Sequence, residues 1–410
     1  MSDTSSAGSP GPTQQLYFTD IDLPVVLEGC PELLPILRRV MPFWPVRMAE
    51  GTSDACIRVA PSASGKYRVS YETDGKAPSE WNAVNAVCEI IADLAWERLR
   101  SDETLFCLHG AAVVFAGRLV IFPNDHRAGK STLTAVLGHQ GRTIFGDDVL
   151  PIAIAPDGTI EGIATGVLPR IRLPVPPSFS PAFQTWAARN AAPGNAQYKY
   201  LDVPGLAAHG ARLPIGAIVR LERKEAQTPM IRPLSAGEAF ESVVDRNFAR
   251  SHHTARILRT FDSLATQVRL ASLVYDSAEE AAELLASEFL SWDTPPATVD
   301  LSFDRSAQPA EDGAEGPAYD PGQRYIRADG LTETTIDGQQ YVADGDGRGL
   351  FRLNPGARII WAVLEEPASG PEVAEIVSTV FPAEDPARIA DDCARTVHDF
   401  LNNALIVPAA

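Results

Sequence analysis

The chain of 410 residues lacks several features that would assign it to a common class. Its cysteines are few and odd in number, and no Cys-x-x-Cys pair occurs, so the sequence predicts neither a disulfide framework nor a structural zinc site. We expect them to be small buried apolar residues in a reducing compartment. These cysteines are Cys30, Cys56, Cys88, Cys107 and Cys393.

Basic residues are also in deficit. Lysine and arginine number 35 against 53 aspartates and glutamates, which gives a formal net charge of −18. A field of this sign repels nucleic acid and anionic lipid, so neither is expected as a partner. No apolar run approaches the length that crosses a bilayer, and the start MSDTSSAGSPGPTQQ has neither the basic residues nor the apolar stretch of a signal peptide. We therefore expect a cytoplasmic protein without membrane contact.

Apolar residues are plentiful, at 45% of the chain, and indicate soluble globular material in two to three domains. The mixture of strand and helix patterns along the chain predicts a mixed α/β (α+β) fold. Residues 1–15 are expected to be a disordered tail, and 294–322, rich in proline, glycine and acid, an interdomain linker. The expected globular parts are an N-terminal α/β part (16–100), a larger domain (101–293) and a small C-terminal domain (323–410).

Apolar spacing predicts the elements of the first two globular parts. A helix is expected over residues 79–100, with Ser79 as N-cap and an apolar face of Trp81, Val84, Cys88, Ile91, Ala95 and Leu99. A hairpin with a Gly117-Arg118 turn is expected over 105–122. After it come a short helix (131–141), a strand, acidic turn and strand (142–160), further strands (216–223 and 267–276), a helical stretch (236–261) and a closing helix (277–292).

The C-terminal part carries clear turn and cap signals. TETTI and QQYVA flank Asp337-Gly338, which predicts a two-residue hairpin, and GLFRL supplies a third strand. Three helices are expected to start at Asn354-Pro355, Gly370-Pro371 and Asp385-Pro386, where a capping residue precedes a proline. The sequence thus predicts three strands with three helices.

The stretch FPNDHRAGKST, residues 122–132, follows a predicted strand and opens a predicted helix, as a phosphate-binding loop does. Gly129 would let the backbone approach a β-phosphate, Lys130 would reach β- and γ-phosphate oxygens, and Ser131 would ligate Mg²⁺. Asn124 stands where such loops usually begin with glycine. The alternative is a lysine-bearing helix start that binds no nucleotide. The candidate nucleotide-binding residues are Asn124, Asp125, His126, Arg127, Ala128, Gly129, Lys130, Ser131 and Thr132.

His109, in LHGAAVV, lies 15 residues before Asn124, and Gly146-Asp147-Asp148 comes 15 residues after Ser131. Together with the loop these residues resemble the catalytic domain of bacterial HPr serine kinases, whose fold is related to phosphoenolpyruvate carboxykinase. The resemblance covers roughly residues 80–290 and implies ATP and Mg²⁺ as cofactors. It implies Asp147 as general base, Lys130 at the phosphates, Asp148 beside Mg²⁺ or phosphate, and His109 in support.

The chain also departs from that family. The family carries a glutamate and an Arg-Gly pair after the aspartates, where this chain has TGVLPRIRLPVP, and Glu161 is a poor substitute as last metal ligand. The family's Arg-Asn signature is echoed by Arg246-Asn247, which makes Arg246 a candidate phosphate contact; the alternative is a solvated helix face. No regulatory domain typical of the family is evident, so HPr is not the expected substrate. The family's hexamers imply a homo-oligomer.

The C-terminal part resembles the PqqD-like peptide-recognition domain, with its core in LFRLNPGARIIWAVLEEPASGPEVAEIV. In that family the leader of a ribosomally made precursor peptide adds a strand to the sheet edge. The resemblance implies an edge at Leu350, Phe351, Arg352 and Leu353, opposite a helix from about 386 to 403. The alternative is a winged-helix-like domain with no partner, or one that reads DNA, which the acidic sequence disfavours.

The two resemblances lead to one functional hypothesis and two alternatives. The leading hypothesis is an ATP-dependent kinase that phosphorylates a serine-type hydroxyl on a ribosomally synthesised precursor peptide, as in lasso-peptide tailoring. One alternative is a non-catalytic protein that senses nucleotide and delivers peptide to another enzyme. The other is a kinase for a small molecule or another protein.

Overall fold

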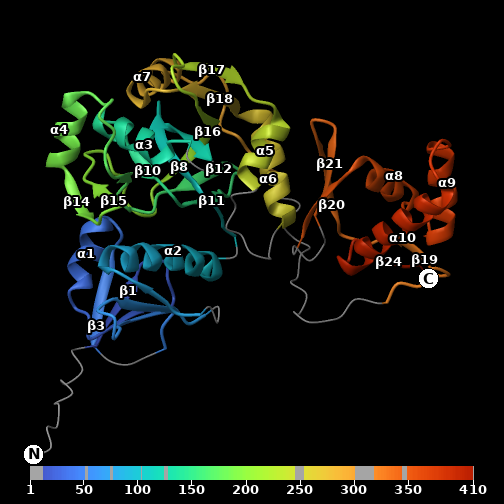
Figure 1. Ribbon diagram of the computed structural model, residues 1–410, viewed down its shortest axis with the longest axis horizontal. Coiled ribbons are helices and arrows are strands. Elements are labelled where there is room, and N and C mark those ends of the chain that lie inside the picture. Colours follow the sequence, from blue (N-terminus) through green and yellow to red (C-terminus); the bar gives the residue numbers. More distant parts are fainter. Residues whose placement is uncertain are drawn as a thin grey trace, which may run out of the picture. The chain divides into compact units, whose positions relative to one another are not determined.

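The computed structural model describes residues 13–50, 54–73, 77–102, 104–123, 128–244, 254–300, 318–343 and 349–409. The chain forms two compact units (Figure 1). The first contains Met1–Leu234, Glu241–Phe248 and Gln267–Ala297, and the second Ser235–Phe240, Ala249–Thr266 and Thr298–Ala410. The division thus assigns to the second unit part of the helical stretch predicted within the larger domain. No helix in the described ranges is long and apolar enough to cross a membrane.

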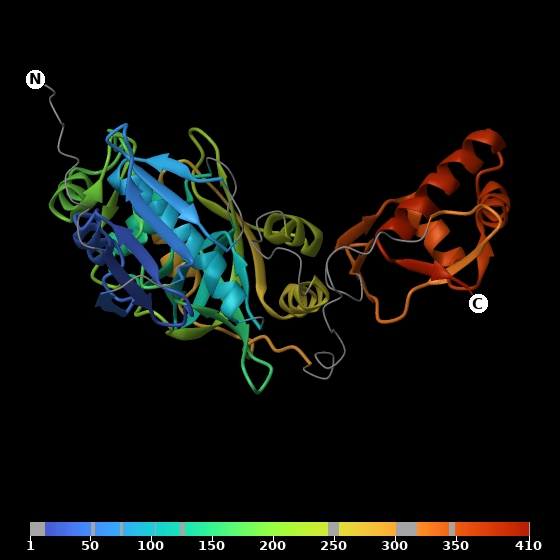
Figure 2. The same ribbon diagram turned by 90° about the horizontal axis from the view of Figure 1, so that it is seen from below.

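The first unit begins with a six-stranded sheet in the order β3-β1-β2-β4-β5-β6. Strand β1 starts at Thr13, inside the segment expected to be a tail, because Leu16 and Phe18 are buried in the core. Helix α2 (Ala83–Ser101) lies between this sheet and the second sheet in both views (Figures 1 and 2). The other elements are β1 (Thr13–Phe18), β2 (Val25–Glu28), α1 (Leu33–Val40), β3 (Val46–Glu50), β4 (Ile57–Pro61), β5 (Tyr67–Tyr71) and β6 (Ser79–Trp81).

Helix α2 differs from its prediction at the start and in the phase of its buried face. Ser79 belongs to β6, and the N-cap is Asn82, whose Oδ1 accepts from the Asn85 N–H at 3.0 Å. Because α2 lies between two layers, it is buried on more than one face, and its fully buried positions are Ala86, Val87, Ile90 and Leu94. Cys88 and Ile91, predicted on the core face, are half-buried beside a cavity.

The second sheet has the order β10-β8-β9-β16-β12-β11-β7, with β18 between β16 and β17. Strands β9, β16 and β18 are parallel neighbours, and the other pairs are antiparallel. Helices α3 (Lys130–His139) and α7 (Ala278–Glu288) pack on each other. The strands are β7 (Phe106–Leu108), β8 (Gly110–Phe115), β9 (Arg118–Pro123), β10 (Ile144–Gly146), β11 (Leu150–Ile154), β12 (Ile160–Ile163), β16 (Arg212–Arg223), β17 (Met230–Pro233) and β18 (Arg269–Tyr275).

The predicted hairpin is confirmed, with a corrected turn. Phe115 pairs with Arg118, so the turn residues are Ala116 and Gly117, with φ of 44° and 80°. Positive φ at both positions suits the twist of a two-residue hairpin. A small sheet that the sequence did not predict completes the unit. It has the order β13-β15-β14 and consists of β13 (Arg170–Arg172), β14 (Ala191–Gly194) and β15 (Tyr198–Leu201), with α4 (Pro181–Arg189) between β13 and β14 in the chain.

The second unit contains the predicted sheet β20-β21-β22 and the three predicted helices. Asn354 and Asp385 cap α8 and α10, but Ser369, not Gly370, caps α9, because its side chain forms a capping box with Glu372. A further sheet, β23-β19-β24, was not predicted. The elements are β19 (Arg324–Arg327), β20 (Thr332–Ile336), β21 (Gln339–Ala343), β22 (Leu350–Leu353), α8 (Pro355–Val363), β23 (Ala368–Ser369), α9 (Gly370–Val380), α10 (Pro386–Asn402) and β24 (Ile406–Pro408).

Within this unit, earlier helical residues cover the β20–β21 hairpin. The predicted helical stretch is two helices, α5 (Ala236–Val244) and α6 (Thr254–Gln267). Phe240 stacks edge-on against Phe261 and Tyr341, at centroid distances of 4.8 and 4.5 Å, and the Thr334 hydroxyl donates to Asp262 at 3.1 Å. Strand β22 remains at the end of the described sheet.

The Asn82 cap should matter for stability, because α2 joins two layers of the first unit. Replacing Asn82 with alanine leaves first-turn N–H groups without an acceptor and should cost about 1 kcal/mol of unfolding free energy. Asn82→Asp keeps an acceptor and is the matched control. The measurement is urea denaturation of both variants; an equal loss in the aspartate variant would contradict the assigned cap.

Candidate functional site

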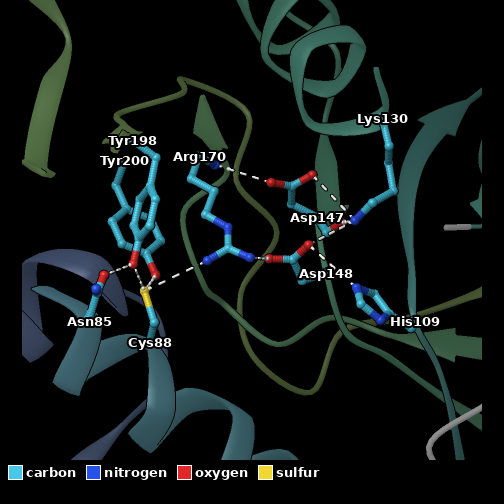
Figure 3. Close-up of polar contacts among 9 residues, drawn as sticks. All are labelled: Asn85, Cys88, His109, Lys130, Asp147, Asp148, Arg170, Tyr198 and Tyr200. Carbon is cyan, nitrogen blue, oxygen red and sulfur yellow. Dashed lines mark hydrogen bonds and ion pairs between the residues drawn. The ribbon is translucent and has the colours of Figure 1, made fainter. Parts of the chain in front are cut away.

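The site forms where helix α3 starts beside the end of β10. Lys130, the first residue of α3, is only 6% exposed. Its ammonium donates to the main-chain oxygen of Asp147 and to Oδ1 of Asp148 at 2.8 Å, and lies 3.9 Å from Oδ1 of Asp147 (Figure 3). A buried ammonium is costly unless it is paired in this way. The sequence-predicted Lys130 and Asp147-Asp148 are thus brought together.

The backbone before Lys130 requires glycine. Gly129 has φ of 88°, in the left-handed region, and a Cβ there would stand 2.6 Å from the Tyr275 hydroxyl. That hydroxyl donates to the Ala128 carbonyl at 2.7 Å, so Tyr275 at the end of β18 fixes the loop where α3 begins. Sequence reasoning missed Tyr275, which reads as an ordinary strand residue. Ser131 and Thr132 lie in the first turn of α3, as predicted.

Five predicted residues lie outside the described part of the chain: Asn124, Asp125, His126, Arg127 and Arg246. Their proposed contacts with nucleotide stay predictions. The described residues therefore supply the second half of the candidate loop and the acidic pair that faces it.

Asp147 is 6% exposed and uses its two carboxylate oxygens differently. Oδ2 accepts the Arg170 N–H at 3.1 Å, whereas the buried Oδ1 has no hydrogen-bond partner among the described residues. Burial raises the pKa of Asp147, the Lys130 ammonium opposes that rise, and the neighbouring Asp148 charge adds to it. A raised pKa makes this carboxylate a stronger proton acceptor than an ordinary aspartate.

Asp148 is held by cations instead. Its Oδ2 pairs with Arg170 Nη2 at 2.5 Å, and its Oδ1 lies 2.8 Å from Lys130 Nζ and 3.8 Å from His109 Nε2. Burial alone would raise the pKa of Asp148, but Lys130, His109 and Arg170 outweigh it and hold that pKa well below its usual range. The pKa values of the two adjacent carboxyls are thus shifted in opposite directions. His109 lies between β7 and β8, beside the pair.

Arg170 on β13 is a site residue that sequence reasoning missed. Its guanidinium pairs with Asp148, donates to the Cys88 thiol at 3.7 Å and lies over the Tyr198 ring, 5.0 Å from the centroid. Burial alone would lower the pKa of Arg170, but Asp148 together with the other acidic neighbours outweighs burial and raises it. The only signal in the sequence was its place in TGVLPRIRLPVP, the stretch that departs from the resembled family.

The Arg170 side chain is itself held by helix α2 and strand β15. The Cys88 thiol lies 2.9 Å from both the Tyr198 and Tyr200 hydroxyls, and Tyr198 donates to Asn85 at 2.5 Å (Figure 3). Burial raises the pKa of both tyrosines, so they remain neutral donors. The N-terminal layer therefore orients the cation that holds Asp148.

The described residues contain no group of three or more His, Cys, Asp or Glu arranged to hold a metal ion. Glu161, considered as a last ligand, lies on β12 and faces Arg212 at 4.0 Å. Magnesium, however, commonly takes one or two carboxylates together with phosphate oxygens and waters. Asp148, 31% exposed at its side chain, and the Ser131 hydroxyl at the start of α3 fit that pattern.

Two cavities adjoin these residues. One of about 110 Å³ borders Gly129 and Thr132 and is lined by Phe179, Arg223 and Tyr275 among others. The other, of about 170 Å³, borders Asp147 and Asp148. The helix start and the acidic pair therefore each border a cavity.

The predicted peptide edge Leu350, Phe351, Arg352 and Leu353 corresponds to β22. Leu353 is buried, Leu350 and Phe351 are half-buried, and Arg352 is exposed. The contact with a peptide stays a prediction.

Comparisons with known proteins leave the family open. No protein-family profile and no curated protein matches the chain. Among solved structures, the HPr(Ser) kinase/phosphatase from Coxiella burnetii aligns with 11% identity over 44% of this chain and 91% of that chain, at a TM-score of 0.23. A score this low does not establish a shared fold, so any function must be argued from the residues of this chain.

Removing the charge of Asp147 and removing the charge of Asp148 should change the free energy of unfolding in opposite directions. The folded-state pKa of Asp147 is raised above 3.8, so its ionisation destabilises the fold as pH rises from 3.8 through that higher pKa. The stability of Asp147→Asn relative to the wild type should therefore increase from about pH 4.5 to about pH 7.5. The measurement is urea denaturation without Mg²⁺ or nucleotide.

Asp148→Asn is the matched comparison. The lowered pKa of Asp148 means that its stabilisation is fully present above 3.8 and is lost only as pH falls below that value. This variant should be less stable than the wild type by a similar amount at both pH values. A shared pH trend in the two variants would refute the assigned difference.

Proposed function

We propose that this chain is an ATP- and Mg²⁺-dependent kinase that phosphorylates a serine-type hydroxyl on a ribosomally synthesised precursor peptide. One observation carries the proposal: a buried lysine begins a helix after a left-handed glycine and meets two aspartates with opposite pKa shifts. Phosphoryl transfer needs a cation for the phosphates and a carboxylate for the acceptor hydroxyl.

The start of α3 supplies the phosphate side. Free N–H groups of a first helical turn and the helix dipole favour an anion there, and Lys130 adds a full charge. Lys130 now donates to Asp148 and to the Asp147 carbonyl, so phosphate binding would exchange these acceptors for phosphate oxygens. The cavity of about 110 Å³ beside Gly129 and Thr132, with Phe179 in its wall, adjoins the helix start and would take one ring of the nucleotide rather than the whole nucleoside.

Asp147 supplies the acceptor side. Its Oδ1, which has no hydrogen-bond partner among the described residues, would take the proton of the acceptor hydroxyl as the hydroxyl oxygen attacks the γ-phosphorus. The Arg170 N–H holds the other oxygen and so fixes the direction of the carboxylate. Lys130, 3.9 Å away, opposes the rise that burial gives to the pKa of Asp147.

Asp148 and Ser131 are the residues that would hold magnesium. At this position magnesium would supply positive charge that offsets the charge of the phosphates. Arg170 and His109 keep Asp148 ionised for this role, and Cys88 and Tyr198 hold Arg170 in place. The acidic pair thus has one member for the proton and one for the cation.

The peptide substrate is proposed from the C-terminal unit. Strand β22 ends the described sheet, and an end strand can pair with an extended leader. The PqqD-like pattern supports this use. Residues 294–322 would then tether the bound peptide near the kinase site and raise its effective concentration.

Lys130→Ala and Asp147→Asn should each lower ³²P transfer from ATP to the precursor peptide by about 10³-fold, because each removes a charge from the transition state. Mass spectrometry should show a gain of about 80 Da on the wild-type product. Lys224→Ala and Asp157→Asn change exposed residues and are the controls. Wild-type protein that binds ATP but never adds this mass would favour the nucleotide-sensing alternative, and undiminished transfer in both variants would refute the mechanism.

The edge β22 should matter only for peptides that carry a leader. Leu350→Asp places a charge where the leader would pack and should raise KM for the full precursor about tenfold, which corresponds to about 1.4 kcal/mol. KM for a leader-free peptide should not change. Ile376→Asp, at an apolar position of α9 that is 45% exposed, is the matched control in the same unit. An equal effect of both variants on KM would contradict the assignment of β22 as the strand that binds the leader.

A further inference from the structure

The cavity beside the acidic pair has a defined construction. It measures about 170 Å³ and lies between helix α2, the turn that carries Asp147 and Asp148, and the segment from Ile163 to Arg170. All of these belong to the first unit. The proposed mechanism uses only its acidic end.

The walls of this cavity are largely apolar. Helix α2 contributes Ile91, Ala92 and Ala95, and the facing segment contributes Val167 and Leu168. The polar end is formed by Asp147 and Asp148, with Arg170 beside them. An apolar pocket with a few convergent polar groups is the usual form of a small binding site.

A second observation points to a ligand at the polar end. Asp147 lines this end and is only 6% exposed, and its buried Oδ1 lacks a hydrogen-bond partner among the described residues, with the Lys130 ammonium 3.9 Å away. A buried acceptor without a donor is costly, so a hydroxyl brought to this end would gain a strong hydrogen bond.

The volume limits what can enter. Pockets for whole small molecules generally measure about 300–1,000 Å³, whereas a cavity of about 150 Å³ accepts a benzene ring. At about 170 Å³ the cavity admits one ring-sized group and excludes a sugar or a nucleoside. Arg170 and Arg98 also line the cavity, but they already pair with Asp148 and with Asp20 and Asp102, so a carboxylate beside the two aspartates would gain little compensation and is disfavoured as well.

We propose that this cavity binds the phosphoryl acceptor, and that the acceptor is a hydroxyl on an uncharged, largely apolar body no larger than one aromatic ring. Serine, threonine and tyrosine side chains belong to this class. The assignment of the ligand as the phosphoryl acceptor rests on the proposed function. The preference of the cavity for such a hydroxyl can be measured without phosphoryl transfer. In the transfer, the hydroxyl proton passes to Asp147, the new oxygen–phosphorus bond forms at the γ-phosphorus, and ADP leaves with the electrons of the broken bond.

The experiment is ¹⁹F NMR on the full chain with three ring-sized probes. We expect saturable binding of 4-fluorophenol, weaker binding of fluorobenzene, which cannot donate to Asp147, and no binding of 4-fluorobenzoate. Fluorobenzene binding as tightly as the phenol, tighter benzoate binding or absence of saturable phenol binding would each overturn the proposal.

Filling variants locate the binding. Ala92→Leu fills the cavity from α2 and Val167→Phe fills it from the facing segment, so each should reduce phenol binding at least about tenfold. Ala83→Leu, on the same helix but outside the lining, is the matched control. Phenol binding unchanged in both filling variants would place the site elsewhere and overturn the proposal.

The same variants separate this inference from the proposed function. If the chain is a kinase, Ala92→Leu should lower kcat/KM for the peptide at least about tenfold and leave KM for ATP unchanged. If the wild type binds the phenol in this cavity but transfers no phosphate, the cavity assignment holds and the kinase proposal fails. If transfer proceeds unchanged with the cavity filled, the kinase proposal holds and the acceptor assignment fails.

Discussion

The buried ammonium of Lys130 is the interaction on which the rest of the first unit's site depends. It lies at the start of α3 and bonds to the main chain of Asp147 and the carboxylate of Asp148 at the end of β10. A lone buried ammonium would be strongly destabilising, so the main-chain oxygen of Asp147 and the carboxylate of Asp148 are what allow Lys130 to be buried where the helix and the strand end meet. The joint also brings together the charges that phosphoryl transfer would use.

Around this joint, the residues divide the acidic pair into two roles. Cations surround Asp148 and hold its pKa low. Burial raises the pKa of Asp147, whose Oδ1 has no hydrogen-bond partner among the described residues. The division is set from outside the phosphate loop, because Arg170 contacts both aspartates and is itself positioned by Cys88 on α2 and Tyr198 on β15. The N-terminal layer therefore contributes to the site both through this network and through the walls of the acceptor cavity.

Local patterns predicted the parts that local physics controls. The β8–β9 hairpin, helix α3 with Gly129 before it, and the caps Asn354 and Asp385 follow from turn, helix-start and cap preferences that act within a few residues. The phase of α2 could not be predicted, because it depends on a second layer that contacts Cys88 and Ile91 from the other side. Arg170 and Tyr275 were missed for the same reason: each acts on a residue far away in the chain, Arg170 on Asp148 and Tyr275 on Ala128. Lys130 and Asp147-Asp148 were predicted together because of a family resemblance. Sequence spacing alone does not predict that these residues are in contact.

The central claim is that the start of α3 and the acidic pair form a nucleotide site. The most direct measurement is a crystal structure of the full chain with Mg²⁺ and a non-hydrolysable ATP analogue. The account predicts the triphosphate at the N-terminus of α3, with the Lys130 ammonium moved from Asp148 to phosphate oxygens and Asp147 facing the γ-phosphate. An analogue bound elsewhere, with the bond between Lys130 and Asp148 intact, would contradict it.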